Sequence, residues 1–259
     1  MSSNERRVTG AADGKDPRVG ILAYNYPPYG SVGALRPASW ARYLPGQGLH
    51  PVVFTRHWDG EGKGDRDPVR PSRCREVETT IEGESEVVRA PFTPNLRDRL
   101  ILRQGLNRCS ALRQGLSLSL SLLEMGSFFC DHHAPLYRAA RDSIERHGLD
   151  VLVASGGPFV LFRYAHLLSR EFSFPWVADY RDGWTTSEEL RHAPPLKKLL
   201  NKTFFRFFER AYVGSATAIV TAAPSYAEAL KRLHPEKPIH VVYNGYDDVT
   251  VDRLRALGQ

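Results

Sequence analysis

Short apolar segments alternate with longer segments of helical periodicity, and this alternation constrains the fold more than any other feature. The runs at 150–155 and 176–180 are almost wholly apolar, as expected for strands buried on both faces. Parallel strands need crossover helices between them. The sequence therefore predicts an α/β fold, a Rossmann-like parallel sheet with helices on both faces. The expected strands are 18–24, 51–55, 84–90, 150–155, 176–180, 217–221 and 239–243, and the expected helices are 36–44, 135–147, a segment from Pro158 to Arg170, 195–212 and 225–233.

Other parts of the chain give weaker patterns. Residues 1–17 are polar and are expected to form a flexible leader. Residues 57–86 are charged and rich in Gly and Pro, which predicts a surface excursion with one hairpin. The Leu/Ser alternation at 116–122 has the period of a strand, whereas its flanks favour a helix, so both interpretations stay open. We expect one domain over 18–247 and the start of an interdomain hinge or tail at 248–259.

The charge balance favours an anionic partner. There are 35 Lys and Arg residues against 29 Asp and Glu, a formal net charge of +6. This excess suits a phosphate-bearing ligand or an acidic membrane surface. The basic residues do not form a known nucleic-acid module, so we expect no nucleic-acid partner.

Several other classes lack their sequence signatures. The three cysteines form no paired motif, which favours a reducing compartment. No signal sequence or bilayer-spanning apolar run is visible, so we expect a cytoplasmic protein, free or peripheral at the inner face of the membrane. No HExxH or similar spacing is present, and we expect no metal site.

Three loops fall where strands of a parallel sheet end, which is the edge that binds ligands in such folds. The first contains Gly30, Ser31 and Gly33, where backbone N–H groups and the following helix could approach an anion. The second contains Ser155 and Gly156. For the first loop an ordinary strand-to-helix turn is an equally valid interpretation, and for the second we favour a structural turn.

The third loop, 179–184, carries mixed polar and aromatic chemistry. The carboxylates of Asp179 and Asp182 can accept hydrogen bonds from sugar hydroxyls, and the Arg181 guanidinium can donate two hydrogen bonds to oxygens. The Trp184 ring can stack on a pyranose face. The alternative is that one carboxylate caps a local turn and Arg181 pairs with a neighbour. Both interpretations stay open on the residues alone.

The segment 195–212 is predicted to be one amphipathic helix with a basic row. Its apolar stripe has helical spacing and contains Leu196, Leu199, Leu200, Thr203, Phe204, Phe207, Phe208 and Ala211. Beside it lie Lys198, Lys202, Arg206 and Arg210. We favour a core helix with a solvated basic face. The alternative is a helix that contacts anionic lipid headgroups.

Five segments in order resemble the N-terminal half of a family 4-type glycosyltransferase of the GT-B fold. They are the strand and Gly-rich loop at 18–37, the helix, turn and strand at 41–55, the strand and Gly-Gly-Pro at 150–158, the segment PWVADYRDGW at 175–184, and the strands before the hinge with VVYNGYD at 241–247. The fourth segment is similar to a subgroup with an ADxRDxW pattern. The resemblance covers about 18–247, with a gap over 57–130.

The resemblance implies two Rossmann-like domains that face each other across a cleft. The N-terminal domain holds a sugar or lipid-linked acceptor, and the C-terminal domain holds a nucleotide-sugar. Members retain the anomeric configuration and use no metal or cofactor beyond the nucleotide-sugar substrate. By this resemblance Gly30, Ser31 and Gly33 would approach the donor diphosphate.

The resemblance also implies roles for single residues. Asp182 and Asp179 would be catalytic, while Arg181, Trp184, Ser155 and Gly156 would contact the acceptor. Asn244, Gly245 and Asp247 would form the hinge. Arg181 stands where many members have His, so a base must come from Asp182, Asp179 or the leaving phosphate. Ser31 stands where many have Gly, and a positive φ there would be strained.

The sequence stops about twelve residues beyond the hinge motif. We therefore expect a donor domain that is missing or supplied by a separate chain, and little activity from this chain alone. Cell-envelope or exopolysaccharide synthesis is the role that the subgroup suggests. The alternative function is a non-catalytic, membrane-associated module that binds glycan or lipid.

Overall fold

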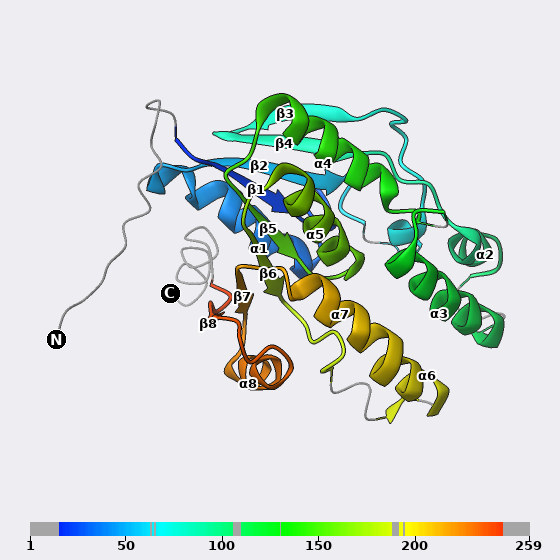
Figure 1. Ribbon diagram of the computed structural model, residues 1–259. Coiled ribbons are helices and arrows are strands. Elements are labelled where there is room, and N and C mark those ends of the chain that lie inside the picture. The colour runs from blue at the N-terminus through cyan, green and yellow to red at the C-terminus, as the bar shows by residue number, and fades with distance from the viewer. Residues whose placement is uncertain are drawn as a thin grey trace, which may run out of the picture.

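A computed structural model describes residues 16–62, 64, 66–105, 110–129, 131–187, 192–193 and 195–245. An eight-stranded sheet in the order β3-β4-β2-β1-β5-β6-β7-β8 forms its centre (Figure 1). All neighbouring strands are parallel except the antiparallel pair β3 and β4. The strands are β1 Arg18–Leu22, β2 His50–Arg56, β3 Glu78–Glu82, β4 Ser85–Ala90, β5 Val151–Ser155, β6 Trp176–Tyr180, β7 Ala218–Thr221 and β8 Ile239–Val241. The predicted Rossmann-like architecture is confirmed.

Helices cover both faces of the sheet. They are α1 Val32–Tyr43, α2 Leu96–Gln104, α3 Ser110–Gly126, α4 Ala134–His147, α5 Val160–Phe172, α6 Pro195–Leu200, α7 Arg206–Val213 and α8 Pro224–Leu233. Helix α1 packs over a core that includes Ile21 and Val53, whereas α4, α5 and α7 pack over the larger core that includes Leu22 and Phe54. Successive strand residues thus point to opposite faces, and both faces are apolar because both are covered.

The excursion 57–86 contains the expected hairpin in part, because β3 lies in it and pairs with β4. The helical interpretation of 116–122 is correct: the Leu/Ser alternation lies inside α3. Helix α1 begins earlier than predicted, at Val32, with Ser31 as its N-terminal flanking residue. Pro37 therefore lies inside the helix rather than in its first turn. Because proline has no backbone N–H, the helix lacks one backbone hydrogen bond at this position.

The segment predicted as one regular helix over 195–212 is interrupted. Five residues, Asn201–Phe205, form a π-helical turn between α6 and α7. A π-turn shifts the phase of the side chains that follow. The half-buried and buried positions of α7 are accordingly Phe208, Glu209, Tyr212 and Val213.

The predicted apolar stripe of this segment is buried only in part. Phe208 packs against the core with its neighbours Phe205, Tyr212 and Val213, and the basic face is exposed as expected, but four large apolar residues of the stripe are not covered. Leu196, Leu199, Phe204 and Phe207 are 61%, 57%, 53% and 66% exposed. No helix in the described ranges is both long and apolar enough to cross a bilayer.

Candidate functional site

A pocket of about 540 Å³ lies at the carboxyl edge of the sheet, where β6 and β8 end beside the start of α1. It brings together residues from three of the predicted segments. Those predicted residues are Ser31, Gly33, Arg181, Asp182, Asn244 and Gly245. Ligands of open parallel sheets bind at this edge, so the pocket is the main candidate site.

Arg181 lines this pocket and lies against two glycines. A Cβ atom added to Gly33 would lie 1.8 Å from Arg181 Nη1, and one added to Gly157 would lie 3.0 Å from Nη2. The guanidinium thus occupies the space that a side chain at position 33 would take. Arg181 Nε donates to Asp182 Oδ2 at 3.0 Å, and the Asp182 side chain is 64% exposed. The pocket thus presents one guanidinium and one solvent-facing carboxylate side by side.

The glycine loop differs from the expectation in two respects. Ser31 has φ −84°, so its extended backbone suits serine and the expected strain does not arise. The Gly30 N–H donates to the Glu61 carbonyl at 2.9 Å, so this group is bound within the protein rather than directed to an anion. The first turn of α1 remains at the pocket through Val32 and Gly33.

Asp179 lies beneath the pocket rather than at its surface. Its side chain is fully buried and receives Arg36 Nε at 3.0 Å on Oδ1 and the Ser155 hydroxyl at 3.0 Å on Oδ2. Burial raises the pKa of the Asp179 carboxyl, and Arg36 and Ser155 offset part of that rise. Asp179, which was predicted to be catalytic, is thus enclosed, and its carboxylate binds Arg36 and Ser155.

Arg36 is the residue that the sequence prediction missed. Its Nη1 donates to the Val242 carbonyl at 2.8 Å and to Asn244 Oδ1 at 3.1 Å, which fixes the predicted hinge against α1. Its guanidinium also lies 5.0 Å from the Trp40 ring. The sequence signal was an arginine in the helix that follows the glycine loop, but its partners lie 143 to 208 residues away.

Three other residues that were predicted to contact the acceptor do not line the pocket. Trp184 is buried and stacks on Phe159 at 5.0 Å, so its ring faces are not open to a sugar. The Ser155 hydroxyl is used by Asp179, and the Gly156 N–H donates to the Asp179 carbonyl at 2.9 Å. In the structure these three residues make contacts within the protein, and their predicted acceptor-binding roles stay predictions. Of the predicted hinge, Asp247 lies outside the described residues, as do 1–15 of the leader and the tail 248–259.

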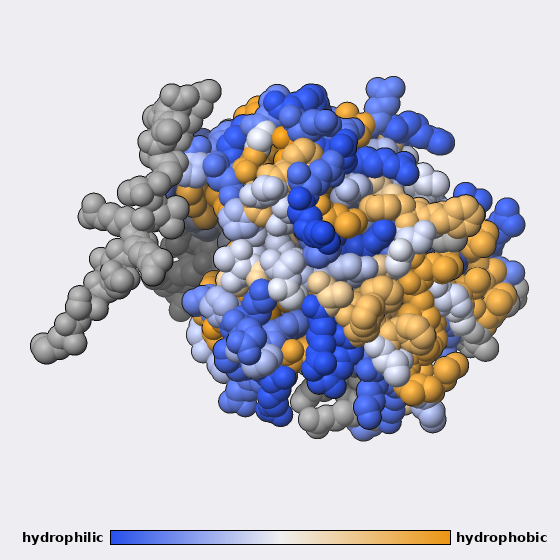
Figure 2. All heavy atoms as spheres, viewed as in Figure 1, coloured by the Kyte–Doolittle hydropathy of each residue, from blue (hydrophilic) through white to orange (hydrophobic). Residues whose placement is uncertain are grey.

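The four basic residues Lys198, Lys202, Arg206 and Arg210 are all exposed on α6, the π-turn and α7. Apolar side chains gather at the side of the molecule where α3, α6 and α7 lie (Figure 2). The Tyr212 hydroxyl of α7 donates to the Met125 carbonyl of α3, so these helices are in contact. The basic row and the exposed apolar residues both lie on the helical segment 195–213.

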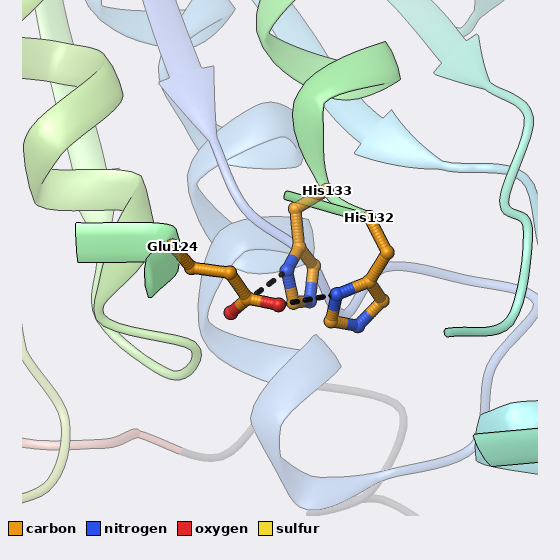
Figure 3. A group of neighbouring side chains, drawn as sticks. All are labelled: Glu124, His132 and His133. Carbon is orange, nitrogen blue, oxygen red and sulfur yellow. Dashed lines mark hydrogen bonds and ion pairs between the residues drawn. The ribbon is translucent and has the colours of Figure 1, made fainter. Parts of the chain in front are cut away.

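A second hollow of about 370 Å³ lies under α2 and α3, near the ends of β1 and β4. Glu124, His132 and His133 meet in its wall (Figure 3). Burial lowers the pKa of His133 well below its usual value, and His132 and Arg56 lower it further. Because Glu124 lies eight residues before His132, across the end of α3, no recognisable ligand spacing marks this cluster in the sequence.

The fold and the main pocket define an α/β domain that binds ligands at the carboxyl ends of parallel strands. A family model described as a glycosyl transferase 4-like domain matches residues 33–245. The chain therefore belongs to this glycosyltransferase family, and its sheet is that of a GT-B domain. None of the curated proteins compared with the chain matches it significantly.

Solved structures share the fold at low identity. A sucrose-phosphate synthase from Thermosynechococcus elongatus aligns with TM-score 0.51 and 12% identity, over 93% of this chain and 99% of that chain. UGT89C1 of Arabidopsis thaliana, solved with UDP-L-rhamnose, gives 0.52 and 13%, over 93% and 54%. The catalytic domain of starch synthase IV from Arabidopsis thaliana, bound to ADP and acarbose, gives 0.51 and 13%, over 91% and 53%. The chain thus spans about half the length of the latter two.

Proposed function

We propose that this chain is the acceptor-side half of a retaining glycosyltransferase that uses a nucleotide-sugar donor. The observation that carries the proposal is the pocket at the carboxyl edge of the sheet. There the first turn of α1, the Arg181–Asp182 pair and the hinge residues Asn244 and Gly245 meet. The reaction class is inferred from family membership, and the pocket is the proposed location of the reaction.

Arg181 and Asp182 would have different chemical roles at this pocket. The Arg181 guanidinium is held against the Gly33 and Gly157 backbone and would stabilise negative charge on the leaving diphosphate. Asp182 has a solvent-facing carboxylate that can accept a proton from an acceptor hydroxyl. Arg181 cannot act as a base, and Asp179 is enclosed, so the base is Asp182 or the departing phosphate itself.

The donor domain would cover the pocket from outside. Val32 and Leu35 at the start of α1, together with Tyr243, are large apolar side chains exposed beside the pocket. An exposed apolar rim around a polar pocket is typical of a surface that another domain contacts. We propose that this domain binds the nucleotide-sugar and is supplied by a longer form of the chain or by a separate chain.

The acceptor is proposed to be a sugar or a lipid-linked sugar, with a role in cell-envelope or exopolysaccharide synthesis. The exposed apolar residues and basic row of 195–213 favour contact with an anionic membrane surface, where such lipids lie. A peripheral position at the inner face of the membrane in the cytoplasm follows from this proposal. No metal or nucleic acid has a part in it.

The same surface also supports the second candidate function, a non-catalytic, membrane-associated module that binds glycan or lipid. The two functions differ in their dependence on the donor. A glycosyltransferase half binds acceptor more tightly, and transfers sugar, when the donor domain and nucleotide-sugar are supplied. A binding module retains glycan or lipid with no response to either.

The test is sugar transfer from labelled nucleotide-sugars to membrane extracts, with this chain joined to or mixed with its donor domain. We expect Asp182→Asn to lower transfer by at least about a hundredfold, because general-base contributions are of that size. Since Asp182 is exposed, the free energy of unfolding should change by less than about 0.5 kcal/mol. Asp142→Asn, at an equally exposed position on α4, is the matched control. Unchanged turnover in Asp182→Asn would remove Asp182 from the site.

A further inference from the structure

Three potential metal ligands converge beside the second hollow, which shares no lining residue with the pocket of the proposed reaction. His132 Nδ1 lies 2.5 Å from Glu124 Oε1, and His133 Nδ1 lies 3.7 Å from Glu124 Oε2 (Figure 3). The three ligand atoms all lie within 4.8 Å of one another. Ligands of a tetrahedral Zn²⁺ site are about 3.4 Å apart, given metal–ligand distances of about 2.0–2.2 Å. Small side-chain rotations would therefore close this cluster around one ion.

His133 supplies an independent observation. Its side chain is 92% buried, and its Nδ1 atom makes no hydrogen bond although it faces the Glu124 carboxylate. A buried polar atom without a hydrogen bond destabilises the folded state, and such atoms are rare in native proteins. A neutral imidazole binds a metal through the ring nitrogen that carries no proton.

Glu124 is also a buried carboxylate without a strong cationic partner. Within the described ranges, the ion-pair partners of its carboxylate are His132 and His133. The nearby guanidinium of Arg163 is directed elsewhere, to Asp131 Oδ2 at 3.2 Å and to the Glu124 and Ser127 carbonyls. A buried carboxylate needs a compensating charge, and a divalent cation would supply it.

We propose that Glu124, His132 and His133 bind one divalent transition-metal ion of the Zn²⁺ class. Two imidazoles and one carboxylate are the donor set that Zn²⁺ takes in open sites, with a fourth position left for water or a ligand. The hollow lined by these residues is where that fourth ligand would enter. An oxygen donor such as a hydroxyl or a phosphate is the class of ligand that fits it.

The surroundings contact both histidines, His132 through Asn95 and Asp98 and His133 through Asp131. His132 Nε2 lies 3.8 Å from Asp98 Oδ2, so a carboxylate stands behind the nitrogen that would keep its proton when Nδ1 binds metal. Asp98 is itself fixed at the start of α2, where its N–H binds Asn95 Oδ1. The Asp131 Oδ1 atom accepts the His133 backbone N–H at 3.0 Å, which anchors the His132–His133 turn.

The experiment uses the whole chain without a polyhistidine tag, treated with a chelator and dialysed. Zn²⁺ binding is measured by calorimetry, and Co²⁺ is used as a probe because its visible absorption reports a tetrahedral site. We expect one saturable site per chain and a higher melting temperature with Zn²⁺. Zinc X-ray absorption of the unmodified chain should show two imidazoles, which tests the proposal without any variant.

Variants then assign the ligands. Glu124→Gln and His133→Asn should each weaken Zn²⁺ binding by more than about a hundredfold, and Asp98→Asn by about 10–100-fold. His147→Asn, at an exposed histidine in the last turn of α4, should leave binding unchanged. Absence of a saturable site in the folded chain, or binding that survives both ligand substitutions, would overturn the proposal. The histidines would then be a proton-bridged structural cluster. These results are independent of sugar transfer.

Discussion

The Arg36–Asp179 pair is the residue-scale interaction that most directly holds the candidate site together. Arg36 connects α1 to the end of β6 and to the carbonyl of Val242 after β8. Arg36→Ala would leave the Asp179 carboxylate buried without its cation, which costs about 3–5 kcal/mol of unfolding free energy. Urea unfolding at pH 7 measures this loss.

The loss should be smaller at pH 5 than at pH 7. Without Arg36, burial raises the pKa of Asp179 further, so the folded variant takes up a proton more readily than the unfolded chain. Its stability relative to the native chain therefore falls as the pH rises through the folded pKa. Arg42→Ala, also on α1, is the comparison substitution. A pH-independent loss would contradict the assigned pairing.

His234, at the end of α8, gives a prediction of acid sensitivity. It is buried, its Nε2 makes no hydrogen bond, and burial lowers its pKa to about 4, with smaller contributions from Arg210 and Lys237. The unfolded value is about 6.5. Because the folded pKa is the lower one, stability is fully present above about 6.5 and is lost as the pH falls toward 4.

We expect His234→Leu to flatten this part of the stability profile. The free energy of unfolding of the native chain should fall by up to about 1.4 kcal/mol per pH unit more than that of the variant between pH 6.5 and 4. Chemical unfolding at several pH values in that window measures the difference. His147→Leu, an exposed site, should keep the native slope, and equal slopes in all three proteins would exclude His234.

At the scale of elements, Glu209 connects α7 to the segment that follows β6. Its fully buried carboxylate accepts the Tyr180 hydroxyl at 2.8 Å and the Thr185 hydroxyl, and Thr185 in turn accepts Asn201 Nδ2 at 3.2 Å. These bonds frame the loop that carries Arg181 and Asp182. Burial raises the pKa of Glu209, and the two hydroxyl contacts lower it in part.

Glu209→Leu should destabilise the fold by about 2–6 kcal/mol, since two buried hydroxyls would each lose their partner. Glu209→Gln keeps polar partners for both and removes a buried charge, so it should cost less than about 1 kcal/mol. The native chain loses stability as the pH rises through the raised folded pKa, whereas Glu209→Gln should not. Thermal unfolding of the native chain and both variants across pH 5–8 measures these differences in stability. Equal losses of stability in the two variants would contradict the role of Glu209 as the acceptor for the two hydroxyls.

The same elements show which features the sequence could predict. Strands β1, β5 and β6 are visible as apolar runs because they are buried on both faces. The sequence did not show which face of the segment 195–213 is exposed, because the π-turn at Asn201–Phe205 changes the phase of the helix. A regular 3.6-residue period therefore placed Leu196, Leu199, Phe204 and Phe207 in the core, although they are exposed.

The candidate site was predictable as a set of loops but not in its detail. The sequence places Asp179 and Asp182 in one loop, yet their burial differs completely because Arg36, far away in the chain, pairs with Asp179. The meeting of Glu124 with His132 and His133 depends in the same way on how α3 ends. Tertiary contacts of this kind leave no local periodicity.

At the scale of the whole molecule, one side combines exposed apolar residues with a basic row. Leu196, Leu199, Phe204 and Phe207 are exposed on the same helical segment as Lys198, Lys202, Arg206 and Arg210. A helix of this composition inserts apolar side chains between lipids while its cations contact anionic headgroups. A basic residue near such a surface contributes about 1 kcal/mol.

Exchange of the four basic residues for Gln should therefore lower partitioning into phosphatidylserine-containing vesicles on the order of 10²–10³-fold, as measured by sedimentation. Exchange of the four apolar residues for Ser should reduce binding to neutral and anionic vesicles alike, because it removes the inserted area. The double substitution of Val77 and Ile81, exposed apolar residues at β3 and just before it, is the matched control and should bind normally. High salt should weaken the native protein's binding, since charges separated by more than about 8 Å are screened at physiological ionic strength. If all these proteins sediment equally, the segment 195–213 is not the membrane contact, and the acceptor is better sought among soluble sugars.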